Sequence, residues 1–454
     1  MASILSFDVL KTLASDTAGP RLGRLTCQGR NPMQTPHYVA TTSRGVVPHV
    51  SPDVVKRHTA VRSVQIALED FVEKAPKESP PIYDLARSGP NSSLRNFTAF
   101  GQDPIVVLTA RRLPPVACPS SNTETSISIS TSVGFRQLGV EDYVSAASKL
   151  QPDIVVGLAD LVTDRKTSVQ RRGKMGDRTS KWLRLLSDSL RDRRSSSTDA
   201  LSSTSVIFAP VLPIDPTEQA YYLEDVSHEL LDHIAGIVTY DGPSLAALPT
   251  DLKHLPTLAL EDFTDPHQVL DRVAIGVDMI SATFVGAATD QGVALDFSFH
   301  SSLDEPDSSR IVLKPLGQDM WLAKHAIDGS PLHPTCQCYT CRKHHKAYLQ
   351  HLLGAKEMLG WVLLQLHNLQ VLDEFFLAVR QSIDDGTFEA RKSNFHLSYE
   401  RCLPKTAGEG PRIRGYQYKS GPSEAKRNSS AYRSLDDASA RLSEGLDENH
   451  PLNL

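Results

Sequence analysis

The chain has 454 residues, of which 40% are hydrophobic and 22% are charged, and its formal net charge is −5 at pH 7. This composition is typical of a soluble globular protein, and any contact with nucleic acid has to come from a local patch because the chain is not basic overall. No apolar run approaches the roughly 20 residues that span a bilayer, and six unevenly placed cysteines exclude a secreted disulfide framework. The N-terminal segment lacks the basic character of a signal or transit peptide, so we expect a cytoplasmic protein with reduced thiols.

Short apolar runs recur along the chain, with helical stretches between them. Their lack of polar alternation is typical of strands that are buried on both faces of a parallel sheet. Before the last of these strands, Asp265 is expected to cap a helix whose apolar stripe is Val269, Leu270 and Val273. Repeated β/α units predict an α/β fold, either a (β/α)8 barrel or a doubly wound sheet. The runs are 104–110, 152–160, 205–213, 234–242, 256–263 and 273–284.

Two segments differ from this pattern. Segment 165–204 contains a basic run with a serine-rich end, and we expect that end to be a flexible insertion. Eleven Lys or Arg against four Asp between 164 and 194 favour sequence-independent binding of RNA phosphates. The alternative is a solvated helix face that packs Trp182, Leu183, Leu185 and Leu186 inward, and both interpretations can hold together. Segment 406–454 is poor in apolar periodicity and is predicted to be a disordered tail.

Three of the six cysteines lie within "HPTCQCYTCRKHH", residues 333–345. Thiolates at this spacing can converge on one Zn²⁺, which prefers four sulfur and nitrogen ligands, and four protein ligands would make the site structural. The candidate fourth ligands are His333, His344, His345, His351 and His367. On one straight helix His367 would lie roughly 39 Å from Cys341, but a break at Gly354 would bring it back. The alternative is a set of reduced core thiols beside a surface histidine.

The segment 336–370, with its C-x-C-x2-C-x25-H spacing, resembles the zinc motif of the tRNA-guanine transglycosylases. The stretches "AYLQHLL", "KEMLG" and "HNL" match that family too, and a weaker likeness extends over 20–385 through "RLGRL", "TPHYVATTSRGVVPHVS", "QPDIVVGLAD" and "AIGVDMI". The resemblance implies a (β/α)8 TIM barrel over 1–405 that includes a zinc-binding subdomain at about 330–385. It also implies one structural Zn²⁺ per subunit, held by Cys336, Cys338, Cys341 and His367.

The family exchanges a guanine of the tRNA anticodon for queuine, or in bacteria for a precursor base, through a carboxylate that attacks the ribose. That carboxylate ends the family pattern G-[IV]-D-M-F-D, and here Ser281 holds its position. Asp278 cannot replace it, because residues three apart on a strand face opposite sides. The resemblance therefore implies that the chain has no catalytic residue. Asp160 matches the aspartate that holds the base in catalytic members, and its alternative role is a cap at the end of a strand.

The glycine loops of the family are also missing. Catalytic members carry "D-S-G-G-[FY]-Q" and "Q-G-G" loops, whereas this chain contains no Gly-Gly dipeptide. The nearest stretch to the first loop is "YDLARSGPNSS", in which Asp84 lacks the glycines, and "FAPVLPIDP" stands in place of the second.

A retained zinc motif with lost chemistry resembles the non-catalytic members of this family, which pair with a catalytic barrel. The resemblance implies a heterodimer that binds tRNA and exchanges guanine for queuine at wobble position 34 of tRNAs with GUN anticodons, which makes queuosine. It also implies a cytoplasmic protein that can associate peripherally with the mitochondrial outer membrane. The alternatives are a zinc-stabilised RNA-binding protein without such a partner, and an active transglycosylase with displaced catalytic residues. The candidate tRNA contacts are Arg171, Arg172, Lys174, Arg178 and Lys181.

Overall fold

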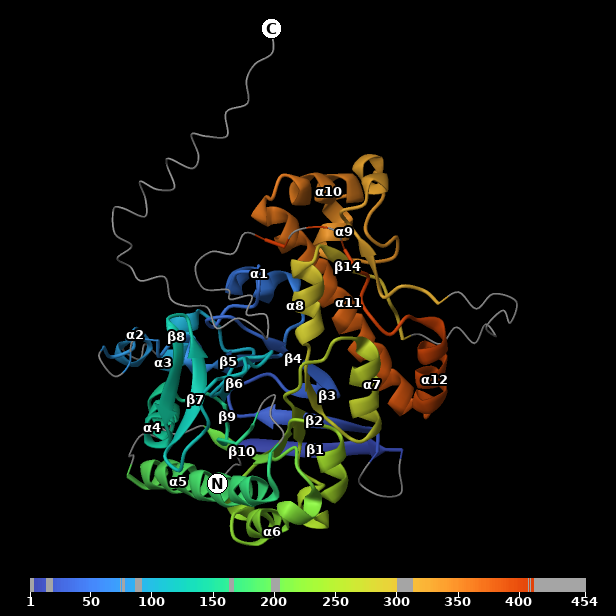
Figure 1. Ribbon diagram of the computed structural model, residues 1–454. Helices are drawn as coiled ribbons and strands as arrows, with labels where there is room; N and C mark the ends of the chain where they lie inside the picture. The colour runs from blue at the N-terminus through green and yellow to red at the C-terminus, as the bar shows by residue number, and fades with distance from the viewer. Residues whose placement is uncertain are drawn as a thin grey trace, which may run out of the picture.

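Eight parallel strands close into a barrel in the computed structural model (Figure 1). Their order around the barrel follows the chain, and the last strand pairs with the first, from Met279↔His37 to Ser281↔Val39. This closure confirms the predicted (β/α)8 barrel and excludes the doubly wound sheet. Each of the six apolar runs contains one of the strands. The strands are β4 (His37–Thr41), β5 (Ser63–Ala67), β6 (Ile105–Thr109), β9 (Ile154–Val156), β10 (Val206–Val211), β11 (Gly236–Thr239), β12 (Thr257–Ala259) and β13 (Met279–Ser281).

The structure describes residues 4–13, 19–73, 75, 78–85, 92–162, 167–196, 205–299, 313–406, 408, 410 and 411. Most of the predicted tail, from 412 onward, and the serine-rich segment 197–204 lie outside the described residues. The domain boundary at 405 therefore stays a prediction.

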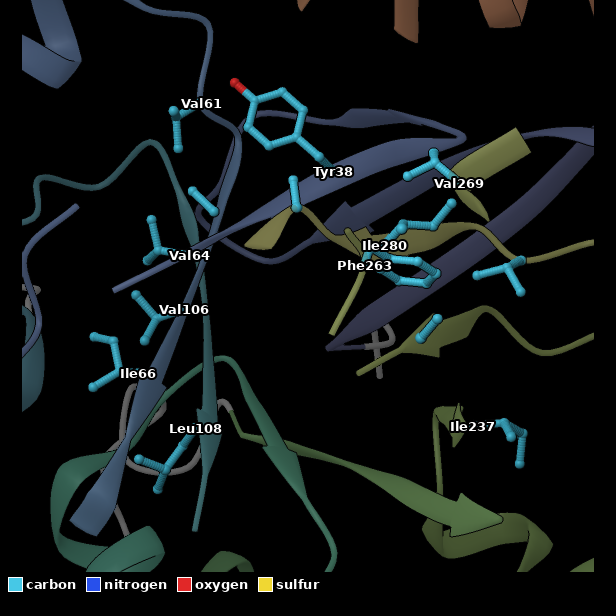
Figure 2. Packing of buried hydrophobic residues seen from close by; sticks show 14 of the residues in the cluster. Tyr38, Val61, Val64, Ile66, Val106, Leu108, Ile237, Phe263, Val269 and Ile280 are labelled. Carbon is cyan, nitrogen blue, oxygen red and sulfur yellow. The ribbon is translucent and has the colours of Figure 1, made fainter. Parts of the chain in front are cut away.

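Side chains along each barrel strand alternate between two cores, because successive residues of a strand point to opposite faces. Val106 and Leu108 of β6 lie in the outer core with Val64 and Ile66 of β5, between the strands and the surrounding helices (Figure 2). Val107 of the same strand lies in the barrel interior. The interior is closed at one end by a three-stranded antiparallel sheet, β1 (Leu5–Thr12), β2 (Arg21–Cys27) and β3 (Met33–Thr35).

Helices and one hairpin connect the strands. Asp265 caps α7 as predicted, since its carboxylate accepts hydrogen bonds from the backbone N–H groups of His267 and Gln268. The apolar stripe of α7 is fully buried. The connecting elements are α1 (Pro52–His58), α2 (Pro81–Asp84), α3 (Ser93–Thr98), β7 (Ser126–Thr131), β8 (Gly134–Gly139), α4 (Val140–Leu150), α5 (Val169–Ser196), α6 (Ala220–His228), α7 (Pro266–Ala274) and α8 (Thr283–Asp290).

The basic run forms a helix over Val169–Ser196. Helix α5 covers 28 residues, and it packs Trp182, Leu183 and Leu186 into the core around the barrel. The inward packing predicted for Trp182, Leu183 and Leu186 is thus confirmed, whereas the serine-rich end from 197 onward lies outside the described residues. Leu185, which was expected to pack inward, is 43% exposed.

The chain after α8 forms a substructure whose helices α9 and α10 lie above the barrel, while α11 and α12 extend along its side (Figure 1). It contains β14 (Val293–Leu295), β15 (Gly317–Asp319), α9 (Tyr339–Lys343), α10 (Lys346–Gly354), α11 (Met358–Asp384) and α12 (Phe388–Ser398). Helix α11 is long and apolar enough to cross a membrane, but 72% of its apolar window is buried inside the protein, as in a core helix. It lies against the start of the barrel, where the Tyr38 hydroxyl donates to Asp373 over 2.7 Å and Arg380 donates to the Pro36 carbonyl over 2.9 Å.

Candidate metal centre and barrel mouth

A reversal of the chain brings His367 back to the three cysteines. Helix α10 ends at Gly354, as the predicted break requires, and Lys356 takes the left-handed conformation with φ of 56° before α11 begins. The two helices then pack closely, because a Cβ atom at Gly360 would lie only 3.2 Å from the Cβ of Leu352. The short α9 carries the third cysteine, and the first two lie in the loop before it.

The four ligand atoms of Cys336, Cys338, Cys341 and His367 lie within 4.8 Å of one another. The distances from the His367 Nδ1 to the three Sγ atoms are 3.6, 3.8 and 3.4 Å. A tetrahedral zinc with ordinary Zn–S and Zn–N bonds places sulfur and nitrogen about 3.5 Å apart. The donor set and its spacing therefore fit a Cys3His metal site.

Hydrogen bonds around the cluster orient its ligand atoms and influence their protonation. The His367 Nε2 lies 3.0 Å from the Leu295 carbonyl, which fixes the proton on Nε2 and leaves Nδ1 bare for a metal. The Cys341 N–H donates to the Cys338 Sγ over 3.3 Å. Hydrogen bonds from Cys336 and burial raise the pKa of Cys338, whereas hydrogen bonds from Cys336 and Cys338 lower the pKa of Cys341. The cluster thus favours at least one thiolate at neutral pH.

The other histidines of the segment have different roles. His333 accepts a hydrogen bond from the Thr335 hydroxyl over 3.0 Å, and His345 caps α10 by accepting from the Tyr348 N–H. His344 stacks on the Tyr348 ring, with 5.4 Å between ring centroids. His351 lies in the last turn of α10. Among the candidate fourth ligands, His367 alone is in the described cluster.

Asn368 is a second structural residue of this segment, which sequence reasoning missed. Its side-chain oxygen accepts from the Leu295 N–H over 2.8 Å, and its amide nitrogen donates to the Thr289 hydroxyl and the Val293 carbonyl. It therefore joins α11 to α8 and β14, directly beside the strand that orients His367. Its only sequence signal was its place in the "HNL" stretch.

Ser281 lies at the C-terminal end of β13 and is fully buried. Its hydroxyl donates to the Glu261 carbonyl over 2.7 Å and accepts from the Glu261 N–H over 3.2 Å. The Glu261 carboxylate is itself bound to Arg272 by two hydrogen bonds. The hydroxyl of Ser281 is thus bonded to backbone on both sides, with no base among its described hydrogen-bond partners to activate it as a nucleophile.

Asp278 lies at the opposite end of β13, under the N-terminal sheet. The Arg21 guanidinium binds its two carboxylate oxygens at 3.0 and 2.5 Å, and the Thr257 N–H donates to it over 2.8 Å. Burial raises the pKa of Asp278, although Arg21 opposes this shift. This carboxylate therefore stabilises the closed end of the barrel.

Asp160 is fully buried beyond the end of β9, and four N–H donors surround its carboxylate. Arg171 binds both oxygens, at 2.5 and 2.7 Å, and Arg178 adds a contact of 3.2 Å. The Asn122 amide donates over 2.8 Å. Because a carboxylate offers about four acceptor positions, these partners leave none for a purine base.

The cations of α5 are largely neutralised within the protein. Besides the two arginines on Asp160, Arg172 pairs with Glu218 at 2.7 Å, and Arg178 also pairs with Glu124 at 2.7 Å. Of the five candidate tRNA contacts, Lys174 and Lys181 are exposed and form no ion pair with any described residue.

A cavity of about 330 Å³ lies at the mouth of the barrel. Its lining includes Arg111, Pro213, Tyr240 and Asp262, at the ends of β6, β10, β11 and β12. Pro213 belongs to the stretch that stands in place of the second glycine loop, and a proline offers no N–H to a ligand. Asp84 ends α2 and is exposed.

Comparison with known proteins adds the family. A family model described as queuine tRNA-ribosyltransferase matches residues 16–401. The chain is 34% identical over 408 residues to a queuine tRNA-ribosyltransferase accessory subunit 2 of Schizosaccharomyces pombe, covering 89% of this chain and 87% of that protein. It is 29% identical to the protein of that name from Anopheles gambiae, over 85% and 88% of the two chains, and 25% identical to the one from Xenopus laevis, over 84% and 97%. The chain therefore belongs to the queuine tRNA-ribosyltransferase family.

Proposed function

We propose that this chain is the non-catalytic subunit of a queuine tRNA-ribosyltransferase complex. The complex exchanges guanine for queuine at wobble position 34 of tRNAs with GUN anticodons, and its catalytic subunit forms a heterodimer with this chain. The relatives that carry the name accessory subunit 2 support this assignment over nearly their whole length.

The observation that carries the proposal is the state of the nucleophile position. Ser281 is buried, and its hydroxyl is bonded to the backbone of Glu261 on both sides. Asp160, the second residue that the family chemistry would use, is saturated by Arg171, Arg178 and Asn122. Both findings argue against an active transglycosylase with displaced catalytic residues, because Ser281 is not activated as a nucleophile and Asp160 has no free acceptor position for a base.

The bound metal is proposed to be one structural Zn²⁺ per chain, held by Cys336, Cys338, Cys341 and His367. Such a zinc supplies folding energy to the loop and no step of the reaction, since four protein ligands leave no open coordination position. The ligands tie the loop before α9 to the middle of α11, and α11 packs on the barrel. The metal would thereby hold the surface around α9 in a fixed shape.

We propose a cytoplasmic location with peripheral association with the mitochondrial outer membrane. The association is proposed as peripheral because 72% of the apolar window of α11 is buried inside the protein, as in a core helix. Washing isolated mitochondria with high salt should therefore release the chain, and retention in the membrane pellet after alkaline extraction would contradict this.

The test is co-purification of the full-length tagged chain from its own cells. A catalytic member of the family, with an aspartate at the nucleophile position and a D-S-G-G loop, should co-purify in equal amount. Recovery of the chain with tRNA but without such a partner would favour the zinc-stabilised RNA-binding protein. Guanine exchange by the isolated chain would favour an active transglycosylase with displaced catalytic residues.

A further inference from the structure

The cavity at the mouth of the barrel has the size and the lining of a small-molecule site. Its volume of about 330 Å³ lies in the range of roughly 300–1,000 Å³ that is typical of ligand pockets. Most of the residues that line it are apolar, and they include Leu113, Ile127, Val156, Leu158, Val162 and Leu260. An apolar cavity of about 150 Å³ binds benzene, so this cavity accommodates two fused rings with a polar substituent.

Two of the four charged residues that line the cavity are already neutralised. Arg112 pairs with the buried carboxylates of Glu69 and Asp70, at 2.9 and 3.3 Å. Glu261 pairs with Arg272 at 2.7 Å. These two groups therefore have no charge left for a ligand.

Arg111 and Asp262 are the remaining charges, and neither forms an ion pair with a residue that the structure describes. The Arg111 guanidinium donates from Nε to the Ser128 carbonyl and from Nη2 to the side-chain oxygen of Asn122, each over 2.9 Å. Its Nη1 has no hydrogen-bond partner within the described part of the chain. Asp262 is exposed. The cavity thus holds a cation that neutral partners fix in place and that keeps a donor for a ligand.

Tyr240 supplies a second donor to the same cavity. It follows β11, and its hydroxyl has no hydrogen-bond partner among the residues that the structure describes. Burial raises the pKa of Tyr240, so the hydroxyl stays protonated, and the charge of Arg111 opposes this shift, as expected for a guanidinium close to the hydroxyl. The two side chains can therefore donate to one acceptor group of a ligand.

The polarity of this cavity is opposite to that of a site for a purine base. A guanine presents N–H donors to a carboxylate, and Asp160, which matches the base-holding aspartate of the family, is saturated by other donors. The groups that are free here are donors, and one of them is a permanent cation beside an apolar wall. A planar guanidinium matches the geometry of a carboxylate.

We propose that the mouth of the barrel binds a small planar aromatic carboxylate. Its ring lies against the apolar wall, and its carboxylate accepts hydrogen bonds from Arg111 and Tyr240. This ligand site goes beyond the proposed function, because it serves neither guanine exchange nor the pairing with a catalytic subunit.

The test is an NMR titration of the full-length chain with naphthalene-2-carboxylate and with naphthalene-2-carboxamide, its matched uncharged analogue. The carboxylate should bind once per chain and roughly 10-fold more tightly than the amide, because it accepts charge-assisted hydrogen bonds. Guanine should not compete with it. Val162→Trp, which fills the cavity, should abolish the binding of both ligands.

Two variants test the donors separately. Arg111→Gln should remove the preference for the carboxylate over the amide, and Tyr240→Phe should weaken binding of the carboxylate roughly 5-fold. Tyr221→Phe is the matched control and should change nothing, since Tyr221 is 87% exposed on α6 and does not line the cavity. Asp262→Asn should strengthen binding of the carboxylate about 2-fold, because it removes a like charge. Melting temperatures show that each variant is folded.

Four results would overturn the inference. They are absence of binding, equal affinity of the wild type for the carboxylate and the amide, an unchanged preference in Arg111→Gln, and displacement of the carboxylate by guanine. The comparison of the two ligands on the wild type needs no substitution, so the inference can fail even if Arg111→Gln does not fold. The co-purification experiment does not depend on this cavity, so the two proposals can fail separately.

Discussion

Replacing Cys338 by alanine should remove the metal and open the loop that the metal holds. Cys338 is buried, and its sulfur lies 3.8 Å from the His367 Nδ1 within the four-ligand cluster. Cys402→Ala is the matched control, because Cys402 is exposed and lies outside the cluster. The full-length chain is used for both variants.

The size of the effect follows from how little else holds this loop. Helix α9 has only five residues, far below the roughly 12–15 that make an isolated helix marginal in water. A structural zinc contributes on the order of 10 kcal/mol to the folding of its site, and the described side-chain hydrogen bond from α9 to α11 is that of Thr340. The loop should therefore open without the metal. The apolar cluster of Leu349, Leu353 and Trp361 should keep α10 packed on α11.

Metal analysis and limited trypsin digestion measure this opening together. Zinc content should fall from about one per chain to near zero. Cleavage after Arg342 and Lys343 should rise at least about 100-fold, since cleavage tracks the population of the open form. Unchanged zinc content in Cys338→Ala, or equal protection of both trypsin sites in the two variants, would refute the assignment of the ligands.

Three further predictions concern buried polar groups. Asp160→Ala should cost about 3 kcal/mol of unfolding free energy, because it leaves two guanidinium groups without their carboxylate; an equally stable variant in urea unfolding would contradict a structural role. Asn368→Ala should cost roughly 3 kcal/mol by the same measurement, since three hydrogen-bond partners lose their bonds, whereas a cost below about 1 kcal/mol would show that water replaces the amide. Burial raises the pKa of Asp373 to about 6, so the folded state binds a proton between that pH and the unfolded value of 3.8. The stability of the wild type relative to Asp373→Asn should therefore rise by roughly 2–3 kcal/mol as pH falls from 6.5 to 4; a difference that stays flat would be evidence against the raised pKa.

Six of the eight barrel strands could be predicted from the sequence because strands buried on both faces read as continuous apolar runs, whereas β4 and β5 were not among these runs. The cysteine spacing predicted three metal ligands by itself. The choice of His367 depended on the family resemblance, because five histidines were open as the fourth ligand. The turn after Gly354 that brings His367 to the cysteines depends on the packing of α10 against α11.

What could not be predicted depends on partners that are distant in the sequence. The charge density of α5 indicated an RNA surface, but the carboxylates that neutralise it belong to Asp160 and Glu218, outside the helix. Arg342 and Lys343 are the converse case. Their charges are visible in the sequence, but only the fold shows that they lie beside the end of α1. A count of charges does not distinguish paired groups from free ones.

The most direct test of the central claim is the incorporation of radiolabelled guanine into tRNA by four preparations. These are the chain alone, the catalytic partner alone, the two together, and the pair in which this chain carries Ser281→Ala. We predict no exchange by the chain alone and full exchange by both pairs, because the Ser281 hydroxyl is hydrogen-bonded to the backbone of Glu261 and does not act on the substrate. Exchange by the isolated chain that Ser281→Ala abolishes would contradict the account.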